Sequence, residues 1–446
     1  MSGQLLARER IAYGAADFGV NLYFISVMSY LSFFYTDVFG LTPEDAALVV
    51  LVARWVDAVT DPMMGAIAER TRSRWGRMRP YLLFGAPLFG LTAVATFTAP
   101  ELSYGGKLAW AYVSYTLFGL LYTVVTVPYA SLTASLTSDS HERTVLSTVR
   151  MAFAFTGGLL VSVFMLPLVG LADSPEAGFR NSMAAFAVLA TLLMWWTFAG
   201  TTERMEPPGE QRLGLMGSAR AVLRNPPLAI VIGIFVLSML AFTLRQSMGP
   251  YFFLYNVGRP DLIPWYFGIT IGVMIPTLAL VPPLSARFGK AGAVSVGAVV
   301  SLLGSVGLWL TPVDQILALF VFASIMAIGA TPVAVLGWAM IPDTVDYAEW
   351  RSGVRADGSV FATASFCQKL GKMIAGAGLL AVLAAFGYVA GSEQSPATLE
   401  AIAMLISLGP GACMVLLIVF AVIYPLSAVR HGEIVDTLAE RRLATR

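Results

Sequence analysis

The chain has 446 residues, of which 57% are hydrophobic and only 12% are charged. A soluble domain carries about 25% charged residues, so this composition, with a mean hydropathy of +0.75, excludes an ordinary soluble protein and indicates an integral membrane protein. The net charge of +1 and the lack of a basic stripe argue against a nucleic-acid partner, and two isolated cysteines argue against a disulfide framework or a CxxC metal site.

Twelve apolar segments are long enough to cross a bilayer as helices, which takes about 20 residues each. In chain order they are 11–39, 45–68, 80–99, 106–135, 145–171, 181–200, 228–256, 264–285, 292–311, 314–342, 359–388 and 401–428. No small-residue cleavage site follows an apolar core at the N-terminus, so the first segment is expected to be a retained transmembrane helix. The sequence therefore predicts an all-α protein of the lipid bilayer with twelve transmembrane helices.

Basic residues alternate between the two sides of these segments. With both termini inside, the cytoplasmic loops hold the clusters 70–79, 204–224 and 430–446. The opposite loops hold only Lys107, Arg180 and Arg259. This is the distribution of the positive-inside rule, so both termini are expected in the cytoplasm and the protein in the cell (inner) membrane.

The longest polar stretch between spans divides the chain into two parts. We expect a six-helix half at 1–200, a cytoplasmic linker at 201–227, a second half at 228–428 and a cytoplasmic tail at 429–446. The loops repeat: RTRSRWGR and ARFGK follow the second and eighth helices, and SDSHER and DTVDYAEWRSGVR follow the fourth and tenth. Two pseudo-symmetric six-helix halves are typical of the major facilitator superfamily, whose substrate site lies between the halves.

Three charged residues lie in the middle of the second predicted helix. Arg54, Asp57 and Asp61 are spaced i, i+3 and i+7 and so share one helix face. Asp57 is about 18 Å from the outer end of the helix, and a charge at such a depth costs about 2.5–3.5 kcal/mol. Two carboxylates one turn apart can bind a small monovalent cation or hold a transferable proton. The alternative is an Arg–Asp pair that only ties helices together.

Other charges within the spans are less specific. Lys369 is near mid-depth and is expected to face a cavity, whereas Arg150 and Arg245 fit structural ties and site residues equally well. Asp17 is within two turns of the predicted cytoplasmic end, where water can reach it. The motifs GxxxxGKS/T and HExxH and a nucleophile elbow do not occur, so no enzyme activity, catalytic residue, resident metal or cofactor is expected.

Several motifs resemble one known family, the glycoside–pentoside–hexuronide:cation symporters, to which melibiose permease belongs. ARWVDAVTDPMMG followed by RSRWGRMRPYLL is similar to its second helix and the loop after it, and DTVDYAEWRSGVR with Lys369 downstream is similar to its tenth and eleventh helices. AYGAADFG, YTVVTVPYASL and the VR pair at 149–150 also fit. The resemblance covers both halves in order.

The resemblance implies roles for individual residues. The cation, Na⁺ or H⁺, would bind at Asp57, Asp61, Thr60 and Thr123. The residues expected around a sugar cavity are Asn21, Arg54, Tyr122, Thr126, Arg150 and Lys369. Trp338 is added to this set because a sugar-binding site typically needs aromatic faces beside its polar groups. Asn21 and Thr126 replace two aspartates of the melibiose branch, Ala130 replaces its tryptophan, and Thr60 replaces an asparagine; these departures leave the sugar and the choice between Na⁺ and H⁺ open.

The sequence thus predicts a monomeric, cation-coupled symporter that imports a sugar or glycoside, a small-molecule substrate, by alternating access. A charge network of Arg143, Asp343, Asp346 and Arg355 is expected to close the cytoplasmic side. Two alternatives remain open: a carrier of lysolipids or other amphiphiles in the same superfamily, and a membrane sensor that retains the fold without transporting.

Overall fold

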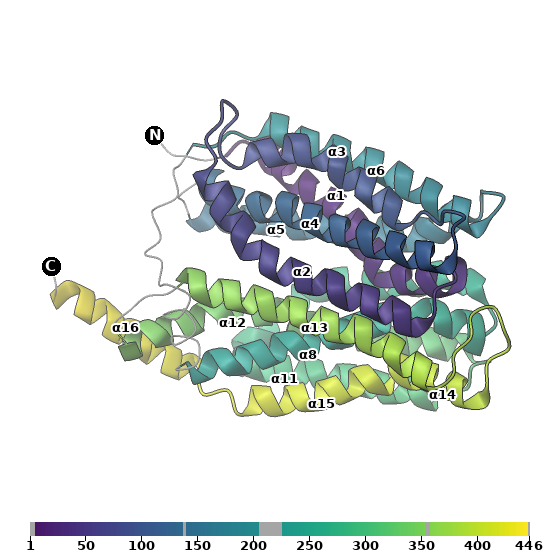
Figure 1. Cartoon of the computed structure of the whole chain (residues 1–446). Helices are drawn as coiled ribbons and strands as arrows, with labels where there is room; N and C mark the ends of the chain where they lie inside the picture. Colours follow the sequence, from purple (N-terminus) through teal and green to yellow (C-terminus); the bar gives the residue numbers. More distant parts are fainter. Residues whose placement is uncertain (1–4, 137–139, 205–224, 353–356, 445–446) are drawn as a thin grey trace. The chain divides into compact units, whose positions relative to one another are not determined.

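The computed structural model describes the chain except for residues 1–4, 137–139, 205–224, 353–356 and 445–446 (Figure 1). The side chains of some helical residues also lie outside the description, among them those of Arg54, Asp61, Arg143 and Lys369. The described residues divide into two compact units. Unit 1 comprises residues 1–208, 249–271 and 376–399, and unit 2 comprises 209–248, 272–375 and 400–446.

The first half of the chain forms six long helices. They are α1 (Ala7–Phe33), extended by a π-helical turn η1 (Phe34–Val38), then α2 (Pro43–Arg70), α3 (Arg79–Thr96), α4 (Tyr104–Leu136), α5 (Ser140–Val169) and α6 (Pro175–Gly200). Local sequence explains two of the starts. Thr42 and Ser174 each accept a hydrogen bond from the backbone N–H three residues on, and each precedes a proline at the first helical position.

The helices of the second half of the chain are interrupted more often. It comprises α8 (Pro226–Tyr251) with a π-helical turn η2 (Phe252–Asn256), η3 (Pro260–Leu262), α9 (Ile263–Gly272), α10 (Met274–Thr277), η4 (Leu278–Leu280), α11 (Val281–Leu310), α12 (Ile316–Ser352), α13 (Asp357–Ala385), α14 (Pro396–Ile406), α15 (Leu408–Val422) and α16 (Ala428–Ala444). All of these elements are helical, as the sequence predicts.

Among the described residues, nine stretches are long and apolar enough to cross a membrane. One of them, Pro260–Leu310, contains two predicted spans, which are separated at Gly289, where φ is 70°. The helices α2 and α3 supply the second and third predicted spans, so the described helices account for all twelve. Leu91, Leu303 and Leu317 are 66%, 63% and 79% exposed on these helices, as expected for side chains that face lipid.

Two predicted spans are not continuous helices. The eighth span passes through α9, α10 and the 3₁₀ turn η4 before α11 begins, because Pro276, Pro282 and Pro283 remove backbone donors along it. The twelfth span is divided between α14 and α15 at Ser407, whose carbonyl accepts a hydrogen bond of 2.5 Å from the hydroxyl of Ser305 on α11. A side chain of a neighbouring helix thus donates a hydrogen bond to a backbone carbonyl at the break.

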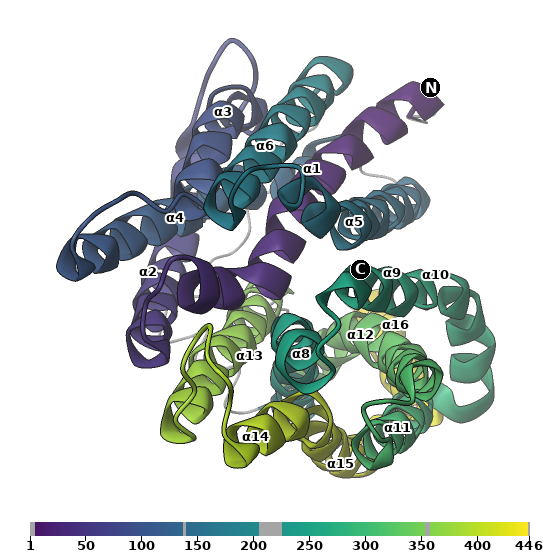
Figure 2. The same ribbon diagram turned by 90° about the vertical axis from the view of Figure 1, so that its right-hand side faces the viewer.

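Within unit 1, α1 lies between α5 and α6, α3 lies against α4 and α6, and α2 lies against α4 (Figure 2). The helix α3 is held at its start by Glu203, whose carboxylate accepts hydrogen bonds of 2.8–3.0 Å from the backbone N–H groups of Arg77, Met78 and Arg79. Arg79 also donates to the carbonyl of Phe198 at the end of α6. The loop after the second span is therefore tied to the segment after the sixth.

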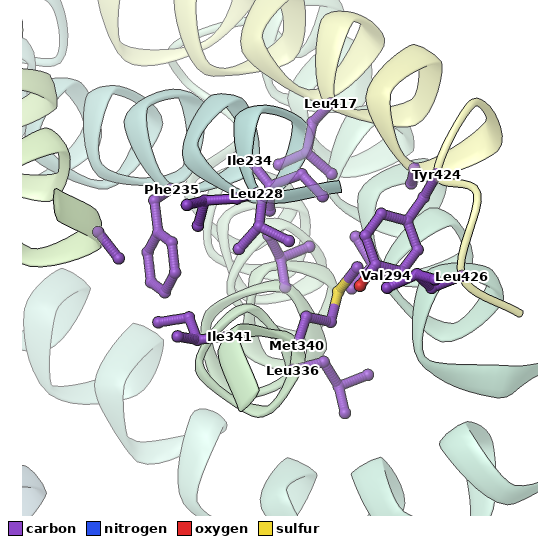
Figure 3. Packing of buried hydrophobic residues seen from close by; sticks show 14 of the residues in the cluster. Leu228, Ile234, Phe235, Val294, Leu336, Met340, Ile341, Leu417, Tyr424 and Leu426 are labelled. Carbon is purple, nitrogen blue, oxygen red and sulfur yellow. The ribbon is translucent and has the colours of Figure 1, made fainter. Parts of the chain in front are cut away.

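Unit 2 is held together by a core in which α11 packs on α12 and α15, and α16 packs on α12. Figure 3 shows the packing of buried hydrophobic side chains in this core. Aliphatic side chains dominate this core, including Leu228, Val294, Met340 and Leu417. The apolar side of α16 joins it through Ile434 and Leu438, which are 2% and 5% exposed. The residues after the last span thus form an amphipathic helix docked on unit 2.

Candidate functional site

Asp57 is the predicted cation ligand that the structure describes best. It is the fifteenth residue of the 28-residue helix α2, near its midpoint, and it is only 4% exposed. It faces α4 at Gly119, where a Cβ atom would lie 2.3 Å from Asp57 Oδ1 and 3.1 Å from its Cγ. The carboxyl group therefore occupies the space that any larger residue at position 119 would fill.

The α4 face opposite Asp57 carries a second predicted ligand. Thr123 follows Gly119 by one helical turn, so both lie on the same face of α4, and Thr123 is 1% exposed. The hydroxyl of Thr60, by contrast, donates to the carbonyls of Val56 (3.0 Å) and Asp57 (3.3 Å) within its own helix. Asp61 lies on α2 one turn beyond Asp57, and its side chain is outside the described part.

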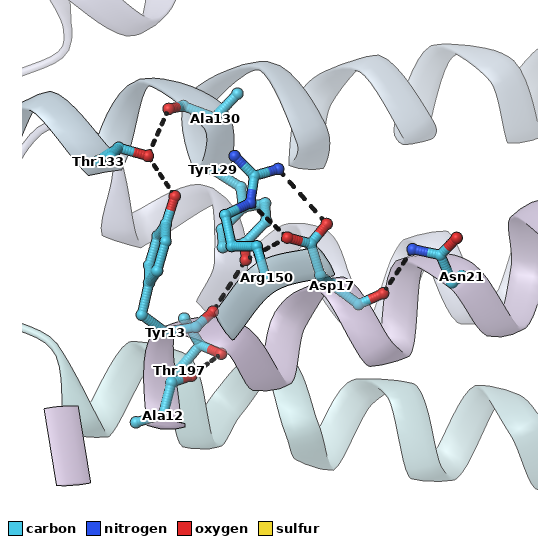
Figure 4. A network of polar contacts seen from close by, with 9 residues as sticks. All are labelled: Ala12, Tyr13, Asp17, Asn21, Tyr129, Ala130, Thr133, Arg150 and Thr197. Carbon is cyan, nitrogen blue, oxygen red and sulfur yellow. Dashed lines mark hydrogen bonds and ion pairs between the residues drawn. The ribbon is translucent and has the colours of Figure 1, made fainter. Parts of the chain in front are cut away.

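A second buried charge cluster joins α1, α4 and α5 (Figure 4). Arg150 donates through Nε to Oδ2 of Asp17 and through Nη2 to Oδ1 at 3.4 Å. Tyr129 donates to the same Oδ2 at 2.9 Å, and its ring lies 4.8 Å from the guanidinium carbon of Arg150. The structure therefore buries Asp17, at 8% exposure, in an ion pair, and does not leave it in water as its place near the helix end suggested.

Tyrosine and threonine side chains close this cluster on the α1 side. The hydroxyl of Tyr129 lies 2.9 Å from the carbonyl of Tyr13, and the Tyr13 hydroxyl bonds to that of Thr133 on α4. Because the cluster uses three helices of unit 1, it fixes their mutual positions. Arg150 acts here as a tie between α5 and α1, which leaves its predicted contact with substrate a prediction.

The remaining predicted substrate residues lie on several helices. The amide of Asn21 donates to the carbonyl of Asp17 (2.8 Å), and the hydroxyl of Thr126 donates to the carbonyl of Tyr122 (2.8 Å). The ring of Tyr122 packs against Phe89 with the centroids 5.9 Å apart. In unit 2, Trp338 is 40% exposed and its ring contacts Phe235 at 4.9 Å. The side chains of Arg54 and Lys369 are not described.

The predicted charge network at the end of the tenth span has partners that the sequence analysis did not name. Asp343 pairs with Lys290, with 2.7 Å from Nζ to each carboxylate oxygen. His431 on α16 lies 3.1 Å from Asp346 and 3.7 Å from Asp343. The other two predicted members, Arg143 and Arg355, lie outside the described side chains.

Unit 2 also contains a cavity that was not predicted from the sequence. Its volume of about 40 Å³ has room for a few water molecules. Four methionines, Phe242, Ser238 and Ser301 line it, together with Arg245 of α8, which is only 3% exposed. The signal in the sequence was the run TLRQS at 243–247, four polar residues in an otherwise apolar span.

Comparisons with known proteins agree with this architecture. A family model described as "MFS/sugar transport protein" matches residues 12–428. The chain is 34% identical to a symporter of Bacillus subtilis, YnaJ, over 97% of this chain and 95% of that one. It is 36% identical to the isoprimeverose transporter of Lactiplantibacillus pentosus, over 89% of this chain and 84% of that one.

Solved structures show the same fold at low identity. The xylose transporter XylE from E. coli, in an inward-open conformation, superposes with a TM-score of 0.65 at 14% identity, covering 94% of this chain and 96% of that one. A bacterial homologue of the lysosomal transporter Spinster gives a TM-score of 0.70 at 13% identity, covering 97% and 99%. These likenesses establish the major facilitator fold.

The predicted resemblance to the sugar:cation symporters is thereby confirmed, and so is the all-α membrane fold of the major facilitator superfamily. The matched region spans both halves and the acids of α2. The chain belongs to the MFS/sugar transport protein family, so it is a membrane transporter of small molecules and not an enzyme.

Proposed function

We propose that the protein couples the inward movement of a cation to the uptake of a sugar or glycoside by alternating access. Relatives that span most of this chain carry the names of symporters, and one carries the name of an isoprimeverose transporter. Isoprimeverose is a disaccharide, so a glycoside of similar size is the first substrate class to test.

The observation that carries the proposal is the burial of Asp57 at the midpoint of α2. A carboxylate at the centre of a bilayer costs about 2.5–3.5 kcal/mol, and a cation or a proton that binds it recovers part of that cost. Gly119 on α4 leaves the space for the carboxyl group. We assign the cation to Asp57 and Asp61, with oxygens from Thr123 and, when its hydroxyl leaves the α2 backbone, from Thr60.

The sugar is proposed to bind among Asn21, Arg54, Tyr122, Thr126, Arg150, Trp338 and Lys369. Hydroxyl-rich ligands need several polar groups and an aromatic face, and this set supplies both. In this proposal, the ion pair with Asp17 would orient the guanidinium of Arg150 toward the bound sugar. Asp17 would then act by positioning one sugar-binding group.

Orientation and organisation are part of the proposal. The alternation of basic loops supports cytoplasmic termini and a place in the cell inner membrane. The boundaries 1–200, 201–227, 228–428 and 429–446 are proposed for the two halves, the linker and the tail, in a monomeric protein. Asp343 and Asp346, with Arg143 and Arg355, are proposed to close the cytoplasmic side. The contacts of Lys290 with Asp343 and of His431 with Asp346 support a charge cluster around these two acids.

The membrane potential can supply the free energy for sugar uptake in this proposal. One cation that moves inward gains about 2.3 kcal/mol per 100 mV of membrane potential. This free energy corresponds to roughly fifty-fold accumulation of a neutral sugar at one cation per sugar.

The test is the thermal stability of the purified protein in Na⁺, Li⁺ and K⁺ at several pH values, for the wild type and Asp57→Asn. Glu44→Gln is the matched control, because Glu44 is an exposed acid on the same helix. A sodium-specific stabilisation that only Asp57→Asn removes identifies Na⁺, and a pH-dependent one identifies H⁺. Should neither ion nor pH distinguish Asp57→Asn from the wild type, cation coupling at Asp57 is refuted.

Uptake of radiolabelled glycosides into proteoliposomes tests the substrate class. An imposed gradient of the stabilising cation is expected to drive accumulation of a glycoside that the wild type takes up and Asp57→Asn does not. Accumulation that ignores the cation gradient would exclude symport.

A further inference from the structure

The C-terminal ends of α1 and α8 have the same unusual backbone geometry. Each helix ends in a π-helical turn, Phe34–Val38 in the first case and Phe252–Asn256 in the second. Each turn is followed two residues later by a glycine with positive φ, Gly40 at 77° and Gly258 at 70°. Short π-helical turns are rare and often occur at functional sites.

The backbone hydrogen bonds repeat as well. In the first turn, the N–H of Phe39 donates to the carbonyl of Phe34 at 2.7 Å; in the second, the N–H of Val257 donates to that of Phe252 at 3.0 Å. The two turns are therefore structural equivalents in the two halves of the sequence. Their fourth residues are Asp37 and Tyr255, and these two side chains are hydrogen-bonded to each other.

The carboxylate of Asp37 is surrounded by hydroxyl donors. Tyr388, in the segment between α13 and α14, lies 2.6 Å from both of its oxygens. Thr36 donates to Oδ2 at 2.6 Å, and Tyr255 donates to Oδ1. All of these residues belong to unit 1. One acid from the first half of the sequence is thus held by two tyrosines from the second half.

Further contacts connect the same segments. The hydroxyls of Tyr251 and Thr36 are hydrogen-bonded to each other at 2.8 Å. The ring of Tyr251 packs edge-on against that of Tyr388, with the centroids 5.5 Å apart. The hydroxyl of Tyr255 accepts a bond of 3.1 Å from the N–H of Gly391. The cluster therefore joins the end of α1, the end of α8 and the connection from α13 to α14.

We propose that Asp37, Tyr255 and Tyr388 form a latch that closes the outer entrance of the transporter and must open in each transport cycle. This proposal rests on the function and orientation proposed above, in which these segments lie at the non-cytoplasmic side. In the structure, the hydrogen bonds of Tyr255 and Tyr388 to Asp37 are formed, so the latch is closed.

The chemistry suits a contact that is broken and remade. Each hydroxyl–carboxylate bond is strong in a low-dielectric surrounding, but water replaces it when the latch opens, so the net contribution of each bond is modest. An apolar seal of the same size would expose its surface to water at full cost. Removing one hydroxyl is expected to shift the closed-to-open ratio by about tenfold, which corresponds to the lower limit of the usual contribution of a bond to a charged group.

The test measures access to a cysteine behind the latch, in the absence of substrate. Ser32→Cys supplies the reporter: position 32 is one turn below Thr36 on α1 and is 8% exposed. In a background without Cys367 and Cys413, a membrane-impermeant thiol reagent is added from outside to cells. Labelling is expected to be slow in the parent protein and about tenfold faster in Tyr388→Phe or Tyr255→Phe.

Tyr104→Phe is the matched control. Its hydroxyl also bonds to a carboxylate, that of Asp45, and to the backbone of Thr42, but these contacts join only α2 and α4 of the first half. The proposal is overturned if the latch variants label no faster than Tyr104→Phe. It is also overturned if the faster labelling merely follows a fall in melting temperature that Tyr104→Phe shares.

A failure of the proposed transport function gives a different pattern. If the protein does not couple a cation to sugar uptake, the Asp57→Asn experiment is negative while the labelling difference persists, because labelling requires neither ligand. A more conservative variant, Asp37→Asn, keeps one acceptor oxygen and is expected to label at an intermediate rate. Labelling of Asp37→Asn that matches the parent rate would contradict a role for the carboxylate charge.

Discussion

Replacing Gly119 by alanine is expected to disturb the buried acid of α2 without altering any polar group. The added methyl carbon would lie 2.3 Å from Asp57 Oδ1, closer than Cβ atoms approach other atoms in folded proteins, and 3.1 Å from its Cγ, which is a tight contact. Either the carboxyl group turns away or α2 and α4 separate. Overpacking of this kind costs about 1–3 kcal/mol.

If a cation binds at Asp57 in this geometry, the same free energy is lost from binding. An affinity loss of about 5- to 150-fold corresponds to 1–3 kcal/mol. The assay is a titration of the purified protein with the stabilising cation, with the melting temperature as readout. Gly105→Ala, on the same helix with nothing within 4 Å of its added methyl group, is the control and is expected to keep the wild-type affinity.

A second background makes the test sharper. In Asp57→Ala the clash is absent, so adding Gly119→Ala is expected to change the melting temperature no more than Gly105→Ala does. Two residues in contact show such non-additivity, whereas independent sites do not. Wild-type cation affinity in Gly119→Ala, or a purely additive double variant, would refute the geometric argument.

Three further predictions concern the other charged contacts. Asp17→Asn or Arg150→Gln is expected to destabilise the protein by roughly 3–5 kcal/mol in thermal unfolding, because each leaves a buried partner uncompensated, and the double variant should lose less than the sum of both. Glu203→Gln is expected to cost about 1–2 kcal/mol and to speed amide hydrogen exchange at the start of α3, since an amide offers one acceptor oxygen to three backbone donors; unchanged exchange there would contradict the capping role. Lys290→Met is expected to lower the melting temperature more than Lys290→Arg, because only arginine keeps a cation beside Asp343, and equal losses would show that the charge is unimportant.

The positions of the spans were predictable because bilayer thickness fixes the length of an apolar helix. Their interruptions were not. The break at Ser407 depends on a hydroxyl from Ser305, which lies 102 residues away in sequence. The π-helical ends of α1 and α8 likewise follow from packing, since the segments FYTDV and FFLYN are compatible with an ordinary helix.

In the candidate site, helical spacing predicted that Asp57 is buried, because three charges on one face must avoid lipid. The opposite wall at Gly119 depends on how α2 and α4 pack, which no local pattern encodes. The partner of Asp17 could not be predicted for the same reason, because Arg150 follows it by 133 residues in the sequence. The run TLRQS around Arg245 did carry a readable signal, since four polar residues in a span rarely face lipid.

The pairing of Asp17 with Arg150 has an electrical consequence. Both residues lie in unit 1, on the adjacent helices α1 and α5, so in the proposed alternating-access cycle the pair would move as a single neutral dipole. A neutral group displaced along the membrane field performs no net work against the voltage, whereas one elementary charge performs about 2.3 kcal/mol per 100 mV. The pair is therefore expected to add almost no gating charge, so transient currents of the proposed transport cycle would come from charges elsewhere in the chain and from the proposed cation.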